Sequence, residues 1–161
     1  MKILNPFPGT VGPLSEAPDP VFAAEMVGSG VLVDPDRTVG VAVAPVAGKV
    51  AKVHPHAYAI ATPDGRGILV HLGIDTVRLN GEGFEILGPL KGEVVAGQEM
   101  IRWDPAAIEA QGLSPVVLVC VLDSAPGSIV SPLLGQHADV GEALFEVEPA
   151  EGSSRRGRRA S

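Results

Sequence analysis

Three of the four histidines, His54, His56 and His71, lie within one short stretch of the sequence. A neutral imidazole nitrogen is a good nucleophile near its ordinary pKa of about 6.5. A second imidazole beside it can donate a hydrogen bond to a charged phosphoryl oxygen. The clustering therefore indicates phosphoryl transfer on a histidine, with His71 and His56 as the candidate pair.

Two apolar runs are expected to position these histidines. Residues 57–61 and 68–71 have the composition of short strands, and residues 62–67 read TPDGRG, which is typical of a turn. A hairpin would place His56 and His71 at the same end of the sheet. Gly73 follows closely and has no Cβ, which leaves room for a phosphoryl group or a partner. We expect His54 to be a surface residue rather than a participant.

The 20 glycines and 15 prolines separate many short runs rich in Val, Ile and Leu, which predicts an all-β fold. We expect an antiparallel β-sandwich or barrel-sandwich with one short helix at residues 104–112, capped by Asp104. The predicted strands are residues 30–33, 39–43, 48–53, 57–61, 68–71, 100–103, 116–122 and 143–147. Weak internal repeats align residues 8–11 with 47–50, 20–23 with 56–59, 28–34 with 65–71, and 97–103 with 141–147.

Length and charge limit the remaining possibilities. The chain of 161 residues suits a single domain, expected at residues 1–151, followed by a disordered basic tail at residues 152–161. A net charge of -7 argues against nucleic-acid binding. No apolar run reaches the roughly 18 residues that a membrane span needs, so we expect no membrane insertion. Residues 5–9 interrupt any secretory signal, and a cytoplasmic location is expected.

Longer motifs carry a family resemblance. Residues 44–50 read APVAGKV, residues 70–77 read VHLGIDTV, and residues 79–84 read LNGEGF, with His56-Ala57 between the first two. Residues 20–30 upstream, and residues 92–98 and 113–117 downstream, also fall in the expected order. Over residues 5–148 the chain resembles the glucose-type enzyme IIA domain of the bacterial phosphoenolpyruvate-dependent sugar phosphotransferase system.

This resemblance implies an antiparallel β-sandwich that carries a phosphoryl group on His71 Nε2, supported by the His56 imidazole, without a cofactor. The implied partners are phospho-HPr as the donor, a cysteine of a IIB permease domain as the acceptor, and regulatory target proteins. Asp19 and Asp75 correspond to acidic residues that flank the site in the family. The resemblance also implies a partner-binding apolar face formed by Val21, Phe22, Met26, Val27, Leu69 and Leu72, residues that ordinary core packing would equally explain.

The chain departs from the family between Lys52 and His56, where it is shorter and has no clear match for a hydroxyl residue that often supports the second histidine. One alternative is a zinc peptidase of the lysostaphin type, since His71-x-x-x-Asp75 and His54-x-His56 resemble its ligands in reversed order. If the chain is a phosphoryl carrier, a zinc ion could still bind incidentally at His56 and His71 without a role in the reaction. A regulatory binding module with the same fold is a further alternative.

Overall fold

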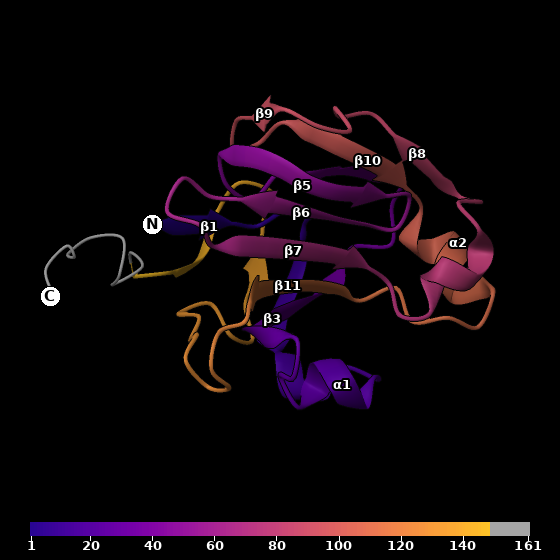
Figure 1. Ribbon diagram of the computed structural model, residues 1–161. Helices are drawn as coiled ribbons and strands as arrows, with labels where there is room; N and C mark the ends of the chain where they lie inside the picture. The colour runs from indigo at the N-terminus through magenta and orange to yellow at the C-terminus, as the bar shows by residue number, and fades with distance from the viewer. Residues whose placement is uncertain (149–161) are drawn as a thin grey trace, which may run out of the picture.

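The computed structural model describes residues 1–148, and the predicted basic tail at residues 152–161 lies outside the described residues. Strands dominate this part of the chain (Figure 1), as the sequence predicts. The strands are β1 (Lys2–Leu4), β2 (Gly9–Pro13), β3 (Gly28–Pro35), β4 (Gly40–Val43), β5 (Gly48–His54), β6 (Ala57–Ala61), β7 (Gly67–Leu72), β8 (Phe84–Ile86), β9 (Glu93–Val94), β10 (Glu99–Trp103), β11 (Val117–Leu122), β12 (His137–Ala138) and β13 (Ala143–Glu146). The helices are η1 (Leu14–Glu16), α1 (Pro20–Ala23), η2 (Thr76–Leu79) and α2 (Pro105–Ala110).

One large sheet and two small ones form the sandwich. The large sheet has eight strands in the order β12-β2-β3-β11-β7-β6-β5-β9. A three-stranded sheet has the order β4-β10-β8, and β1 pairs with β13. All strand pairs in the described residues are antiparallel, which confirms the predicted fold class. In Figure 1, β8 and β10 lie above β5, β6 and β7.

The main core lies on one face of the large sheet. Alternate residues of a strand point to opposite faces, and Val117, Val119 and Val121 of β11 point into this core, each with no exposed surface. The intervening Leu118 and Cys120 belong to a second, smaller cluster on the other face. Leu14 and Ala17 from the η1 region complete that cluster, with Phe22 of α1 packed against it. The central strand β11 is therefore covered on both faces.

Two helices in residues 1–148 begin at a side-chain cap, whereas the sequence predicts one capped helix. Asp104 accepts a hydrogen bond from the Ala107 amide at 3.3 Å and begins α2, as predicted. The second helix, α1, has four residues and begins after Asp19. The prediction of a single short helix is therefore wrong. Within residues 1–148, no helix combines the length and the apolar character needed to cross a membrane.

The internal repeat holds for some segments and fails for others. β3 and β7 correspond in the repeat and flank β11 on its two sides, but their registers differ by two residues, because Val33 lies opposite Val117 and Val70 opposite Val119. Gly97 and Gly141 have φ values of 88° and 89°, and each precedes a strand of the match between residues 97–103 and 141–147. However, residues 20–23 form α1 while residues 56–59 lie largely in β6, so that part of the alignment is wrong.

Candidate functional site

His71 lies near the end of β7 on the outer face of the large sheet. Burial alternates along β7: Ile68, Val70 and Leu72 have no exposed surface, while Leu69 and His71 are half-buried on the other face. Leu69 and His71 therefore share a face, and Leu72 packs in the core. Leu72 cannot contact a partner, and its assignment to the binding face is wrong, because it lies an odd number of residues from Leu69.

Two tight turns bring His56 to His71. The β6–β7 hairpin pairs Ala57 with His71, and the Leu72 amide donates to the His56 carbonyl at 2.8 Å. The ring centroids of His56 and His71 are 5.1 Å apart, with an interplanar angle of 71°. The predicted proximity of the two imidazoles is confirmed. His56 itself lies in the turn between β5 and β6, between the two strands that the sequence predicts at residues 48–53 and 57–61.

One hydrogen bond determines which nitrogen of His71 can react. His71 Nδ1 lies 2.7 Å from the Gly73 carbonyl oxygen. A carbonyl oxygen only accepts, so Nδ1 carries the hydrogen and donates it. The lone pair of the neutral ring is then on Nε2. The geometry of this strand end therefore makes Nε2 the nucleophilic atom.

Gly73 holds its carbonyl in place through an unusual backbone conformation. Its φ is 82°, a region that glycine adopts readily. A Cβ at this position would lie 2.5 Å from Thr76 Cγ2 and 3.0 Å from the Ser114 carbonyl oxygen. The Gly73 amide donates to the Val116 carbonyl at 2.9 Å. The buried Gly73 thus serves close internal packing and ring orientation, which corrects the expectation that it leaves room for a partner.

Burial keeps both imidazoles neutral. Desolvation lowers the pKa of His71 below 6.5, against smaller opposing effects of the Gly73 hydrogen bond, Asp19 and Asp75. The pKa of His56 falls to about 4, mainly through desolvation and further through His71 and His54. At neutral pH the pair therefore consists of uncharged rings, the form in which an imidazole nitrogen can attack phosphorus.

The two predicted acidic residues lie near His71, since both raise its pKa. Asp19 is also a structural residue, because its carboxylate accepts from the amides of Val21 at 2.9 Å and Phe22 at 3.3 Å and caps α1. Asp75 is exposed and has a φ of 63°. Both carboxylates favour a positive charge on the His71 ring.

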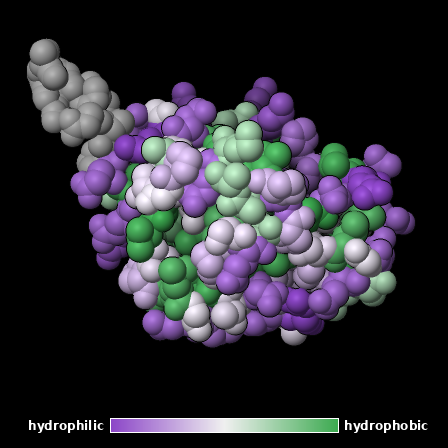
Figure 2. All heavy atoms as spheres, turned by 90° about the horizontal axis from the view of Figure 1, so that it is seen from below, coloured by the Kyte–Doolittle hydropathy of each residue, from purple (hydrophilic) through white to green (hydrophobic). Residues whose placement is uncertain are grey.

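Apolar side chains from the α1 region border His71. The ring centroid of Phe22 lies 5.3 Å from that of His71. Val21 and Met26 are 46% and 74% exposed, while Val27 is half-buried. Figure 2 views the molecule from the side on which α1 lies in Figure 1 and shows small apolar groups scattered among polar side chains. The rim of the site, formed here by Val21, Phe22, Met26 and Val27, thus offers exposed apolar contacts without a continuous apolar surface.

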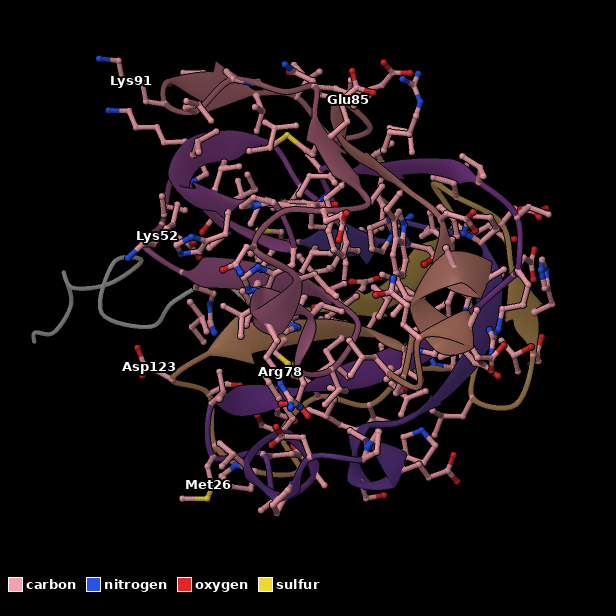
Figure 3. All side chains as sticks on the ribbon, turned by 90° about the vertical axis from the view of Figure 1, so that its right-hand side faces the viewer. Met26, Lys52, Arg78, Glu85, Lys91 and Asp123 are labelled. Carbon is pink, nitrogen blue, oxygen red and sulfur yellow. The ribbon has the colours of Figure 1, made fainter. Side chains whose placement is uncertain are left out.

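A groove of about 290 Å³ adjoins the imidazoles. Its lining includes Lys52 and His54 from β5, Leu69 and His71 from β7, and Leu122 from β11. Figure 3 faces the right-hand side of Figure 1 and shows Lys52, Asp123 and Met26 along one margin, with Arg78 near the centre. Lys52 and His54 are site residues that sequence reasoning missed. Their spacing of two along a strand next to His56 was the available signal.

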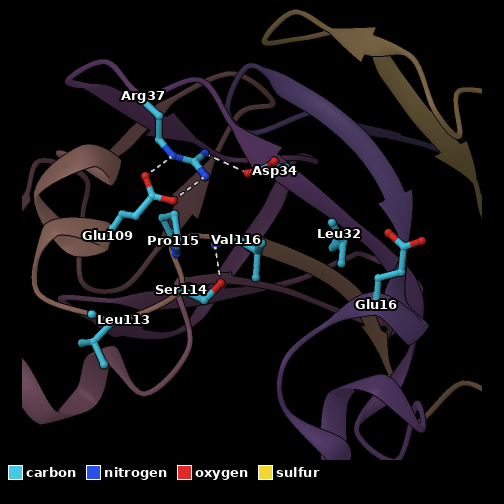
Figure 4. A pocket seen from close by; sticks show the side chains of 10 residues that line it. Glu16, Leu32, Asp34, Arg37, Glu109, Leu113, Ser114, Pro115 and Val116 are labelled. Atoms are coloured by element: carbon cyan, nitrogen blue, oxygen red, sulfur yellow. Dashed lines mark hydrogen bonds and ion pairs between the residues drawn. The ribbon is translucent and has the colours of Figure 1, made fainter.

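A larger cavity of about 510 Å³ has an ion-paired arginine in its lining (Figure 4). Arg37 crosses it, donating to Asp34 at 2.8 Å and to both carboxylate oxygens of Glu109 at 2.9 and 3.1 Å. The only basic group of its lining is thus already paired. Ser114 and Val116, also in the lining, bond through their carbonyl oxygens to the Ile74 and Gly73 amides, so this cavity backs the loop that orients His71.

The zinc peptidase alternative loses its structural basis. Among residues 1–148, no three or more His, Cys, Asp and Glu side chains come together as a group that could hold a metal ion. The rings of His54 and His56 stack on each other instead, with centroids 5.7 Å apart. His54, His56, His71 and Asp75 therefore do not form the ligand set that their order in the sequence resembles.

Comparisons with known proteins agree with this geometry. The family described as phosphoenolpyruvate-dependent sugar phosphotransferase system, EIIA 1, matches residues 1–126. The glucose-specific EIIA components of Bacillus cereus and Bacillus anthracis are each 35% identical over 141 residues, covering 86% of this chain and 84% of theirs. The glucose-specific EIIBCA component of Corynebacterium glutamicum is 33% identical over 151 residues, which is 94% of this chain but 22% of that protein. The solved structure of glucose permease IIA from Mycoplasma capricolum superposes with a TM-score of 0.80 at 30% identity, covering 90% of this chain and 94% of that one.

Proposed function

Because this chain belongs to the EIIA 1 family of the phosphoenolpyruvate-dependent sugar phosphotransferase system, we propose that it carries the phosphoryl group on His71 Nε2. The chain is a phosphotransferase component, a phosphocarrier that takes a group from one protein and passes it on. The observation that carries the assignment of the atom is the bond from His71 Nδ1 to the Gly73 carbonyl, which leaves the Nε2 lone pair free.

The first step transfers the group from phospho-HPr. Nε2 of His71 attacks phosphorus and forms a new N–P bond, while the N–P bond of the donor breaks and its electron pair stays on the donor nitrogen. Since Nδ1 keeps its hydrogen, the His71 ring becomes positively charged as the bond forms. The Gly73 carbonyl, Asp19 and Asp75 all favour this charge. These three groups therefore stabilise the phosphorylated ring.

His56 supports the phosphoryl group from its neighbouring position. Its neutral ring has one N–H, and at a centroid distance of 5.1 Å it stands beside the ring that is modified. We assign to it a hydrogen bond to a phosphoryl oxygen. In the second step a thiolate sulfur of the IIB domain attacks phosphorus, and the electron pair of the N–P bond returns to Nε2.

The exposed rim gives partners a surface to bind. We propose that Val21, Phe22, Met26, Val27 and Leu69 contact HPr and the IIB domain, and that Asp19 and Asp75 meet basic side chains of the donor. The phosphoryl group carries about two negative charges, offset in part by the positive His71 ring, so phosphorylation makes the middle of this rim more negative. Regulatory target proteins that bind the rim would therefore distinguish the two forms. We further propose a cytoplasmic location and a carrier domain at residues 1–151.

Intact mass spectrometry tests the assignment. The protein is incubated with phosphoenolpyruvate, enzyme I and HPr, alongside His71→Gln, His56→Gln and the control His137→Gln, whose ring lies on β12 and pairs with Asp36. One added phosphoryl group is expected on the wild type and on His137→Gln, none on His71→Gln, and a slower gain on His56→Gln. An unmodified wild type, or an adduct that survives in His71→Gln, would refute the proposal.

A further inference from the structure

The His56 imidazole lacks the support that fixes most functional histidines. Within the described residues, no hydrogen bond reaches its ring from a side chain or from the backbone. It lies in the two-residue turn Pro55-His56 and is only half-buried. A side chain free to rotate would lose part of its effect on the reaction, since orientation is what makes a neighbouring group effective. Some other contact must restrict the ring.

His54 supplies that contact. Its ring stacks on the His56 ring with centroids 5.7 Å apart and an interplanar angle of 18°, within the range of favourable ring pairs. His54 ends β5 and pairs in register with Ala57, which fixes its backbone beside the turn. Pro55, between the two histidines in the chain, is packed in turn, because a Cβ on Gly81 would lie 3.3 Å from its Cγ.

We propose, building on the function above, that His54 is a positioning residue that holds the His56 ring by stacking, so that the N–H of His56 faces the phosphoryl group on His71. His54 acts through His56 and does not itself touch the phosphorus. The stacking of His54 on His56 makes the site a cluster of three imidazoles rather than the pair His56 and His71 alone.

The electrostatics of the cluster agree with this arrangement. His54 lowers the pKa of both His56 and His71, which shows that it is close enough to act on both rings. The charged groups around the three rings are Lys52, which lines the same groove, and Asp19 and Asp75 on the side of His71. Because the His56 ring is neutral at neutral pH, stacking between His54 and His56 meets no charge repulsion.

A double-mutant cycle tests the inference. Rates of phosphoryl transfer from phospho-HPr are measured by rapid quench for the full chain and for His54→Ala, His54→Gln, His54→Phe, His56→Ala and the double variant of His54→Ala with His56→Ala. His137→Ala is the control, since its exposed ring lies far along the chain on another strand. Circular dichroism verifies that each variant is folded.

The expected pattern separates stacking from other roles. His54→Ala and His54→Gln should slow transfer by about 2- to 10-fold, the range that one ring pairing corresponds to. His54→Phe should keep the wild-type rate within about twofold, and His54→Ala should have no further effect in the absence of the His56 ring. An equal loss with and without His56, no loss at all, or failure of His54→Phe to retain the rate would overturn the inference. A wild type that accepts no phosphoryl group would instead overturn the function on which it rests.

Discussion

Replacing Gly73 by alanine should impair both stability and phosphoryl transfer. The methyl group would occupy a backbone with a φ of 82° and would approach Thr76 Cγ2 at 2.5 Å and the Ser114 carbonyl oxygen at 3.0 Å. Real Cβ atoms do not come as close as the first of these distances, so the loop must shift. Because the Gly73 carbonyl holds the Nδ1 hydrogen of His71, that shift should also disturb the nucleophile.

Gly65→Ala is the matched control. Gly65 has a similar φ of 89°, but a Cβ there would meet nothing within 4 Å. Its replacement should cost about 1 kcal/mol of unfolding free energy, the strain of the left-handed region less the entropy lost by the unfolded chain. Gly73→Ala adds overpacking of about 1 to 3 kcal/mol, for a total of about 2 to 4 kcal/mol.

Urea denaturation and rapid-quench transfer assays measure the two effects. Gly73→Ala should also slow transfer from phospho-HPr by about 2- to 10-fold, since one hydrogen bond contributes about 1 kcal/mol. Gly65→Ala should transfer at the wild-type rate. If Gly73→Ala lost no more stability than Gly65→Ala, the packing argument would be wrong. If its transfer rate were unchanged, the Gly73 carbonyl would not orient His71.

Burial and charge lead to three other predictions. Leu72→Ala should cost about 2 to 5 kcal/mol in urea unfolding, while Leu69→Ala should cost less and slow phosphoryl transfer more; the reverse order would contradict the assignment of faces. Folding lowers the pKa of His56 from 6.5 to about 4, so the unfolded state binds more protons than the folded state between these pH values. The free energy of unfolding measured across this window should therefore fall as the pH falls. The His56→Gln variant should lack this contribution to the pH dependence. Tyr58→Phe should cost about 1 to 3 kcal/mol in thermal or urea unfolding, since the Tyr58 hydroxyl donates to the buried Val43 carbonyl at 2.6 Å, and a neutral substitution would show that water replaces it.

Most of the longer strands could be predicted from sequence, because a short apolar run between two turn residues is too short for a helix and is typical of a buried strand. All eight predicted strands are present, most within one or two residues of their expected ends. Four of the missed strands, β1, β8, β9 and β12, have two or three residues, while the fifth, β2, has five and was not predicted either; each forms through pairing with a partner distant in the sequence. The α1 helix was detectable in principle, since Asp19-Pro20 is a typical helix start.

The site was predictable where its geometry follows from a hairpin and not where it depends on packing. The proximity of His56 and His71 follows from turn placement alone. The burial of Leu72 follows from the alternation of side chains along a strand. The predicted apolar face ignored this alternation when it included both Leu69 and Leu72. The stacking of His54 on His56 depends on the tight turn around Pro55, and the role of Gly73 depends on its close packing in the loop, so neither could be predicted from composition.

The pairing of β1 with β13 has a consequence for how the protein is made. Ile3, which has no exposed surface in the folded protein, lies opposite Phe145. On a ribosome that adds about 5 to 20 residues per second, β1 is synthesised about 7 to 30 seconds before its partner strand. During that interval an apolar strand edge has no native partner. Pairing of β1 therefore waits for β13, and until then the nascent chain exposes an apolar segment of the kind that chaperones shield.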